Sequence, residues 1–371
     1  MPGYGNVIDK LSEPKNFDAF IQENMKNSTY KADWKNEVSA VEYEASKSFQ
    51  AFTADWSAAR IGNIVEKNAK KPLEVMPQAG EIIGALTRSA GQWQMDNDRL
   101  ERYYYMERRL RDRATNFTQE QYKSEYVKLI QFLFNPFERA VIQPHKRMDA
   151  LYWEGLSNGT FTVNLTNNPK GSDFFEIPVG ITKYGITKGT VWSQANAATM
   201  DVLGTLKDLK DKAKLKGKKV VKYRVSDATF NLMILDKHFA DSVRLTVGMY
   251  QFQNAGIITV DAVNAYLKAV TLAPIEIIEA QALGQDDLGV SLFQDNRVVA
   301  MLADKVAVMK ISDPLEMIEP IPNKVYSTFD DNLVGMWRND QGRFIDYDMW
   351  AMPVFVGRDD VLIVDTSVLQ A

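Results

Sequence analysis

Apolar residues recur at a near-helical period along residues 122–151, and this is the strongest pattern in the chain. Thr118 and Gln121 precede the run with the spacing of a capping box, in which two side chains satisfy free backbone groups at a helix start. The pattern therefore predicts a long helix over 118–156. Two prolines interrupt it and predict a kink or a break, namely Pro136 and Pro144.

The chain before this helix has too few clustered apolar residues to form a core of its own. Residues 1–55 are polar and weakly periodic, whereas 56–99 place short apolar runs on both sides of a KNAKKP turn. This second stretch predicts a long hairpin or extended loop, and Pro72 and Pro77 are unsuited to central strands. A two-stranded hairpin is only marginally stable alone, so it should pack on something else. Residues 98–113 are rich in charge and predict a helix.

After the long helix the period changes to two, which predicts strands. Residues 199–311 then alternate between strand and helix patterns, as in a compact α/β unit, and strand patterns return over 324–371. The strands on both sides suggest that the α/β unit is inserted into another domain. The strands expected around and inside this unit are 161–165, 174–186, 189–192, 218–226, 243–248 and 256–259.

Composition limits the possible chemistry. The chain has 371 residues, of which 45% are hydrophobic and 25% charged, as expected for a globular protein of two to three domains. A net charge of −4 lacks the basic excess of typical nucleic-acid binders. The absence of cysteine excludes disulfides, thiolate nucleophiles and cysteine-ligated metals. The two histidines, His145 and His238, have no neighbouring ligand residues in the sequence, and no signal peptide or membrane-spanning run is indicated, so we expect a soluble intracellular protein.

Short motifs give little support for an enzyme. Residues 155–159 (GLSNG) match the G-x-S-x-G nucleophile elbow, with His238 later in the chain as a hydrolase requires. The elbow needs a strand before the serine and a helix after it, and here the order is reversed. We therefore favour a glycine-rich helix end and keep a serine hydrolase using Ser157 as the alternative. Residues 180–185 resemble a phosphate-binding loop, but Ile186 replaces the required lysine.

Two charged stretches have ordinary explanations. Asp330 begins a calcium-loop-like sequence, but Val334 stands where an oxygen ligand belongs. Eight lysines lie between Lys207 and Lys222, where a solvated helix face is the favoured interpretation and a phosphate-facing patch the alternative.

The order of elements resembles that of the major capsid protein of tailed bacteriophages, a fold shared with encapsulins and the herpesvirus capsid floor. The stretch 257–280 (IITVDAVNAYLKAVTLAPIEIIEA) is similar to the helix-to-strand step of the axial domain in that family, and 298–320 (VVAMLADKVAVMKISDPLEMIEP) to the strands that follow it. The resemblance implies an α+β capsid fold with an N-terminal arm, an extended loop, a long spine helix with a peripheral β-sheet domain, and an inserted α/β axial domain. The implied ranges are arm 1–55, extended loop 56–99, peripheral domain 100–195 and 316–352 with spine helix 118–156, and axial domain 196–315 and 353–371.

The resemblance also implies a function without catalysis, cofactor or metal. The chain would assemble with itself into hexamers and pentamers of an icosahedral head around double-stranded DNA, which it contacts non-specifically. Scaffolding, portal and decoration proteins would be further partners, no membrane would be involved, and the virion would assemble in the host cytoplasm. The expected inter-subunit contacts are Ile61, Ile64, Lys70, Lys71, Ile82, Ile83 and Trp93.

Three alternatives remain at this point. An encapsulin-like compartment would use the same shell fold around a protein cargo, and a tail-tube subunit would form rings or tubes. The third alternative is the serine hydrolase.

Overall fold

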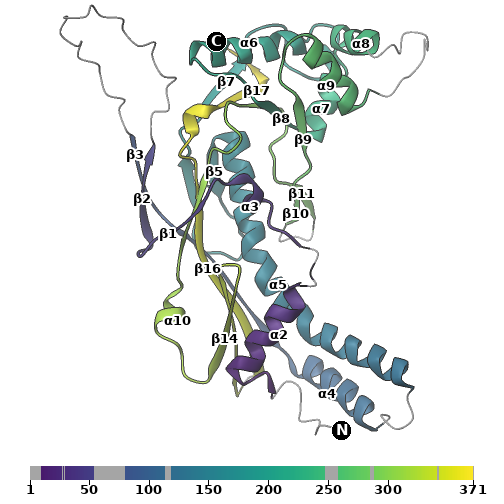
Figure 1. Cartoon of the computed structure of the whole chain (residues 1–371), viewed down its shortest axis with the longest axis vertical. Helices are drawn as coiled ribbons and strands as arrows, with labels where there is room; N and C mark the ends of the chain where they lie inside the picture. The colour runs from purple at the N-terminus through teal and green to yellow at the C-terminus, as the bar shows by residue number, and fades with distance from the viewer. Residues whose placement is uncertain are drawn as a thin grey trace, which may run out of the picture.

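The computed structural model describes residues 10–26, 28, 30–53, 80–112, 118–246, 258–284, 288–340 and 342–370. Figure 1 shows an elongated subunit with an α/β unit at one end and a pair of helices, α4 and α5, projecting from the other end. The helices before the α/β unit are α2 Pro14–Lys26, α3 Trp34–Glu37, α4 Asn97–Asp112 and α5 Gln119–Asn158.

Helix α5 is the spine of the subunit and confirms the predicted long helix. Its capping box is formed, because Thr118 accepts from the Gln121 backbone N–H and donates its own backbone N–H to the Gln121 side chain. The helix ends at Gly159, whose φ of 69° suits glycine. The helix is continuous through both prolines, so the predicted break is wrong. Figure 1 shows that it changes direction along its length, as a proline kink does.

Each proline removes one hydrogen bond to the carbonyl four residues earlier, and another element replaces that bond. Arg99 Nη2 on α4 donates to the Phe132 carbonyl oxygen at 3.2 Å, opposite Pro136. Asn332 Nδ2, fully buried, donates to the Ala140 carbonyl oxygen at 2.9 Å, opposite Pro144. The prolines therefore create docking points on α5 for distant parts of the chain.

The replacement of the missing helix bond at Pro144 by the Asn332 side chain predicts an energetic coupling between these two residues. Asn332→Ala should lower the free energy of unfolding by about 1–3 kcal/mol, because it leaves a buried carbonyl without a partner. In a Pro144→Ala background the same change should be less destabilising, since residue 144 then supplies its own backbone N–H to Ala140. Urea denaturation of the four proteins of this double-mutant cycle measures the coupling. Equal effects of Asn332→Ala in both backgrounds would contradict it.

A six-stranded sheet packs along α5. Its strands follow the order β1-β13-β16-β15-β14, and β4 pairs with the long strand β16, as the register of residues 87–95 against 343–351 shows. All neighbours are antiparallel except β1 and β13. The bounds are β1 Val41–Tyr43, β4 Thr87–Met95, β13 Val308–Ser312, β14 Lys324–Phe329, β15 Asn332–Asn339 and β16 Gly342–Val354.

The α/β unit contains a five-stranded sheet in the order β7-β17-β12-β8-β9. Its central strands β12 and β8 and the first part of β17 are buried, because helices and α5 cover the middle of the sheet, whereas the edge strand β7 is largely exposed. The strands are β7 Thr182–Ile186, β8 Lys222–Ser226, β9 Ile275–Ile278, β12 Arg297–Met301 and β17 Val361–Leu369. The helices are α6 Val202–Leu215, α7 Asp227–Met233, α8 Lys237–Thr246 and α9 Val260–Ala269.

Three predicted strands in and beside this unit are wrong in the described residues, and the first of them, 189–192, holds only an isolated bridge at Gly189. Residues 243–246 belong to helix α8, and Ile258 and Thr259 are not in a strand, because Thr259 caps α9. The alternation Val-Arg-Leu-Thr after residue 242 imitates a strand. Burial of Phe239 and Val243, four residues apart, shows that helical packing decides the conformation.

Two strands pair outside the domain range to which the sequence assigned them. β7 lies in the range 100–195 but pairs in parallel with β17 of the five-stranded sheet. β13 lies in the range 196–315 but pairs with β16 and β1 of the six-stranded sheet. Both pairings join segments distant in sequence, which local patterns do not reveal. The domain boundaries themselves remain a prediction.

The described residues also contain three short antiparallel ladders. The β2–β3 ladder joins 48–53 to 80–85 and forms the base of the predicted extended loop, while β4, within the predicted range 56–99, belongs to the six-stranded sheet. The remaining elements are β2 Ser48–Thr53, β3 Gly80–Ala85, β5 Thr160–Val163, β6 Phe175–Pro178, β10 Gln281–Leu283, β11 Gly289–Ser291, α10 Leu315–Ile318 and the short turns η1 Gln194–Asn196 and η3 Arg358–Asp360.

Candidate assembly surfaces and the arm anchor

The predicted contact residues of the extended loop fall into two groups. Ile61, Ile64, Lys70 and Lys71 lie outside the described residues. Of the others, Ile83 on β3 is 74% exposed, whereas Ile82 points the opposite way and packs on the subunit core. The exposed Ile83 side chain is therefore available to another molecule at the base of the loop.

Trp93 is in a different environment. It lies on β4, half-buried, and its ring packs on Tyr347 of β16 with centroids 5.4 Å apart. Much of this side chain is already used inside the subunit. Trp93 as an inter-subunit contact remains a prediction.

An apolar hollow lies beside the base of the loop. It is formed where β2 and β3 approach β5–β6 and the end of β16. Aromatic and aliphatic side chains line it, including Phe49, Ile83, Phe161, Ile177 and Met352. The hollow carries no cluster of polar groups that would orient a small substrate.

A buried carboxylate attaches the N-terminal arm to the spine helix. Asp149 on α5 is fully buried and accepts from the Trp34 backbone N–H at 2.9 Å and from the Tyr30 hydroxyl at 3.1 Å. Lys146 Nζ lies 3.6 Å from the same carboxylate. The pKa of Asp149 is raised to about 6, mainly by burial and also by the nearby charge of Asp33. The Trp34 N–H, Lys146 and the Tyr30 hydroxyl favour the charged form and act in the opposite direction. The arm thus supplies most of the hydrogen bonds that make this buried charge tolerable.

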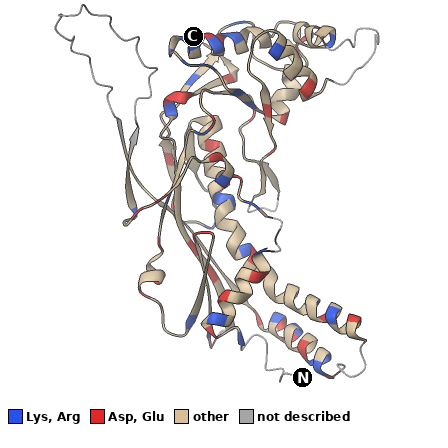
Figure 2. Cartoon of the chain, in the orientation of Figure 1, with Lys and Arg blue, Asp and Glu red and all other residues tan. Residues whose placement is uncertain are grey.

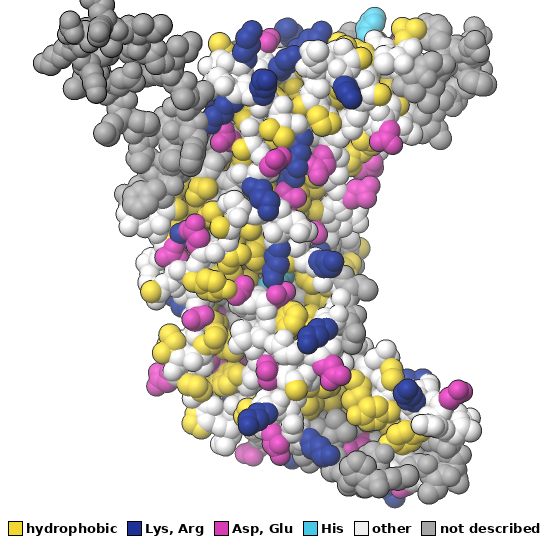
Figure 3. Space-filling view, in the orientation of Figure 1, with side chains coloured by type: hydrophobic (Ala, Val, Ile, Leu, Met, Phe, Trp, Pro, Cys, Tyr) yellow, Lys and Arg dark blue, Asp and Glu magenta, His cyan; other side chains and the backbone are white. Residues whose placement is uncertain are grey.

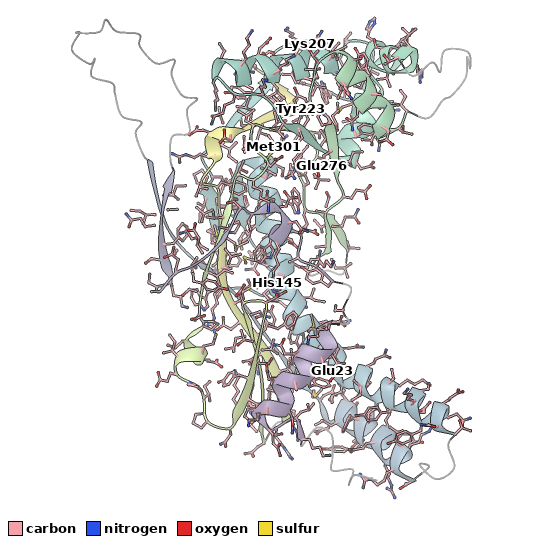
Figure 4. The ribbon with its side chains drawn as sticks, in the orientation of Figure 1. Glu23, His145, Lys207, Tyr223, Glu276 and Met301 are labelled. Carbon is pink, nitrogen blue, oxygen red and sulfur yellow. The ribbon has the colours of Figure 1, made fainter. Side chains whose placement is uncertain are left out.

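His145 lies one helical turn before Asp149 and is also buried against the arm. Its ring stacks on Trp34 with centroids 6.0 Å apart, and neither ring nitrogen has a hydrogen-bond partner among the described residues. Figure 4 places it on the middle part of α5. Burial lowers the pKa of His145 to about 4, and Lys35 lowers it further, while Asp330 and Asp331 act in the opposite direction.

These two residues predict opposite pH dependences. The folded pKa of Asp149 exceeds its ordinary value of 3.8, so its contribution to stability grows as pH falls from about 6 to about 4. The folded pKa of His145 lies below its ordinary 6.5, so its contribution is lost as pH falls from 6.5 to about 4. We expect the two slopes largely to cancel in the natural chain.

Single substitutions should expose each slope. Asp149→Asn should remove the Asp149 slope and keep that of His145, so that the stability of this variant relative to the natural chain decreases by about 2 kcal/mol between pH 7 and 4.5. His145→Phe, which keeps a ring on Trp34, should instead become relatively more stable as pH falls. Urea denaturation at pH 4.5 and 7 measures both. Identical pH dependence in all three proteins would refute the assignment.

A second buried cluster connects the arm, the spine helix and the α/β unit. Arg224 on β8 is 1% exposed, and its Nη1 lies 2.7 Å from Glu37 of α3, while its Nε lies 3.0 Å from Glu276 of β9. Its guanidinium also lies over the Trp153 ring of α5, 5.3 Å from the centroid. Figure 4 shows Glu276 in the α/β unit, above the part of α5 that carries His145. Local sequence patterns do not indicate this cluster, because its members are far apart in the chain.

The arm is held at further points along its length. Lys310 on β13, almost fully buried, pairs with Glu42 and Glu44 of the arm at 2.5 and 2.6 Å. Lys35 pairs with Asp330 at 2.7 Å. The described part of the arm therefore packs against its own subunit, which gives it the support that its composition lacks.

The structure contradicts the hydrolase interpretation of Ser157. The serine lies inside α5, fully buried, with its hydroxyl donating to the Trp153 carbonyl oxygen and accepting from the Gln294 backbone N–H. A nucleophile must be exposed at the end of a strand, so residues 155–159 are the end of a helix. His238 lies on α8, in the α/β unit.

The other motifs have structural roles. Asp330 and Asp331 both have positive φ and form the two-residue turn between β14 and β15. Several lysines of the Lys207–Lys222 stretch pair with acidic groups, as Lys212 does with Asp208 and Lys218 with Asp360. Figure 2 shows that this stretch lies along the outer edge of the α/β unit, where Figure 4 labels Lys207.

Within the described ranges, no helix combines the length and apolar character needed to cross a bilayer. In the same ranges, no three His, Asp or Glu side chains are grouped so that they could hold a metal ion.

Comparison with known proteins gives one result that identifies the fold. No family model matches the chain, and no curated protein matches it. Among solved structures, it aligns over 95% of its length with 98% of a protein assigned as the capsid protein of a prophage in E. coli CFT073, with a TM-score of 0.53 and 9% identity. The chain has the phage capsid fold. The predicted α+β class and capsid fold are thus confirmed.

Two other solved structures align with lower TM-scores. A phage-related protein from Bordetella bronchiseptica RB50 aligns with 95% of the chain and 98% of its own length, at 13% identity and a TM-score of 0.47. The capsid protein of Myoviridae phage XM1 aligns with 91% of the chain and 92% of its own length, at 10% identity and a TM-score of 0.44.

Proposed function

We propose that this chain is the major capsid protein of a tailed bacteriophage, assembling with itself into the hexamers and pentamers of an icosahedral head. The observation that carries the proposal is the capsid fold over 95% of the chain, shared with a prophage protein assigned as a capsid protein. The exposed Ile83 and the apolar hollow at the base of the extended loop support it, because they offer surface to neighbouring copies. Burial of Ser157 argues against the hydrolase.

The proposal includes the partners and location that such a role requires. Scaffolding, portal and decoration proteins, double-stranded DNA inside the head, and assembly in the host cytoplasm belong to it. The exposed lysines of the α6 region, Lys207, Lys214 and Lys219, are candidates for non-specific contact with DNA phosphates.

The test is the assembly state of the purified full-length chain. Light scattering should find species of at least five or six copies, and negative-stain electron microscopy should show closed shells or their capsomers. A stable monomer of 42.1 kDa at all concentrations and ionic strengths would contradict the proposal. Open tubes would favour a tail-tube subunit, and shells filled with a protein cargo an encapsulin-like compartment.

A further inference from the structure

Two apolar patches lie on opposite sides of the lower half of the subunit. The first, here the α10 segment, comprises residues 313–321 between β13 and β14. The second, here the helical hairpin, comprises α4 and the first half of α5, which project from the other side (Figure 1). Figure 3 shows hydrophobic side chains at the surface on both sides. The large exposed apolar side chains are Leu315, Met317, Ile318 and Ile321 in the segment, and Tyr104, Tyr105, Tyr126 and Val127 in the hairpin.

The α10 segment is held rigidly although its apolar side chains face solvent. Prolines at 314, 320 and 322 restrict its backbone, and the Glu319 N–H donates to the Leu315 carbonyl oxygen at 2.8 Å. The Tyr326 hydroxyl accepts from the Ile321 N–H at 3.0 Å. A rigid segment loses little conformational entropy when it docks, which favours binding.

The two patches carry complementary charge. Residues 313–322 contain three acidic residues and no basic residue; Lys324 of β14 pairs with Glu316, and the exposed Glu319 is next to Ile318, which is 75% exposed. On α4, the exposed Arg102, Arg108 and Arg109 lie three or four residues from Tyr105 and outnumber the one exposed glutamate at that spacing, Glu101. Tyr105 is 69% exposed. An acidic apolar segment and an aromatic surface bordered by arginines suit each other.

We propose that the α10 segment of one copy docks on the helical hairpin of the next copy, with Ile318 against Tyr105 and Glu319 beside Arg102 and Arg109. The inference rests on the proposed shell function and names one of its contacts. The occupant is a second copy because both halves of the contact exist on this chain, on opposite sides, where one copy cannot satisfy itself. Such a head-to-tail contact between different patches builds rings or larger arrays.

The absence of natural cysteine allows a direct test. A full-length chain carrying both Ile318→Cys and Tyr105→Cys is assembled, oxidised with copper–phenanthroline and separated on a non-reducing gel. A head-to-tail contact should give a ladder of dimers, trimers and longer products, and each single variant should stay monomeric on the gel. A dimer from either single variant would overturn the proposal, because it would show that the patch contacts the same patch of another copy.

Light scattering separates failure of this contact from failure of the proposed function. Normal assemblies without a ladder would overturn the contact alone, whereas a chain that never assembles would overturn both. Charge reversal supplies a second measurement. Glu319→Arg should raise by about tenfold the protein concentration needed for half assembly, and adding Arg109→Glu should restore most of the loss. Asp211→Arg, on the exposed side of α6, is the matched control and should change nothing.

Discussion

Arg224→Ala should lower the free energy of unfolding by about 3 kcal/mol or more. The arginine is 1% exposed, and its removal leaves Glu37 without its paired cation and Glu276 with Lys222 alone. Breaking a buried ion pair by removing one partner costs about 3–5 kcal/mol, and the partial exposure of both glutamates places the expectation at the lower end. Guanidinium denaturation followed by far-ultraviolet circular dichroism measures the change.

The matched control is Lys222→Ala. Lys222 pairs with the same Glu276 at 3.0 Å but is more exposed, so its loss should cost less than about 1 kcal/mol. The loss of free energy of unfolding in Arg224→Lys should lie between those of Arg224→Ala and Lys222→Ala, because lysine keeps the charge but does not bridge both carboxylates. Equal losses for Arg224→Ala and Lys222→Ala would show that the cluster does not join the arm to the α/β unit.

Replacing residues 54–79 with a short glycine-rich turn should abolish assembly and leave the subunit folded. Thr53 and Gly80 are partners in the β2–β3 ladder, so a turn of about four residues can join them without moving either strand. The replaced stretch contains the predicted contacts Ile61, Ile64, Lys70 and Lys71. Each large apolar side chain buried against a neighbour contributes on the order of 1.5–3 kcal/mol, so losing several should prevent stable shells.

Circular dichroism and thermal melting should therefore match those of the natural chain, while light scattering loses the large species. Ile83→Ser, with the loop intact, is the companion variant, and it should weaken assembly without changing the melt. Shells of unchanged stability after the replacement would show that contacts of the loop do not hold neighbouring subunits together. An unfolded subunit would place the loop in an internal core instead.

Sequence patterns predicted the parts of the fold that depend on neighbours in the chain. The capping box at Thr118 and the apolar period of α5 both act within a few residues, and the structure has both of them. The strand prediction at 243–248 failed because Val243 packs as part of a helix, which only tertiary contacts decide. Long-range pairing, such as β7 with β17, leaves no local trace.

The candidate sites were harder to predict for the same reason. Arg224 sits in the strand sequence KYRVS, where alternation suggests an outward-facing charge. The five-stranded sheet is covered, so the arginine is buried and depends on Glu37, which lies far away in the sequence. Tyr30 and Trp34 lie in the polar, weakly periodic stretch 1–55, and only the fold brings them to Asp149.

Pro144 of α5 affects the order in which the chain folds as it is synthesised. Asn332 donates to the Ala140 carbonyl oxygen, which Pro144 leaves without its helix partner, and Asn332 is synthesised 192 residues after Ala140. Translation adds roughly 5–20 residues per second, so many seconds pass between the synthesis of Ala140 and that of Asn332, and this bond cannot form before then. The full helix should therefore form late, together with β15, so that an incomplete chain does not present a finished spine to other copies before its own sheet is present.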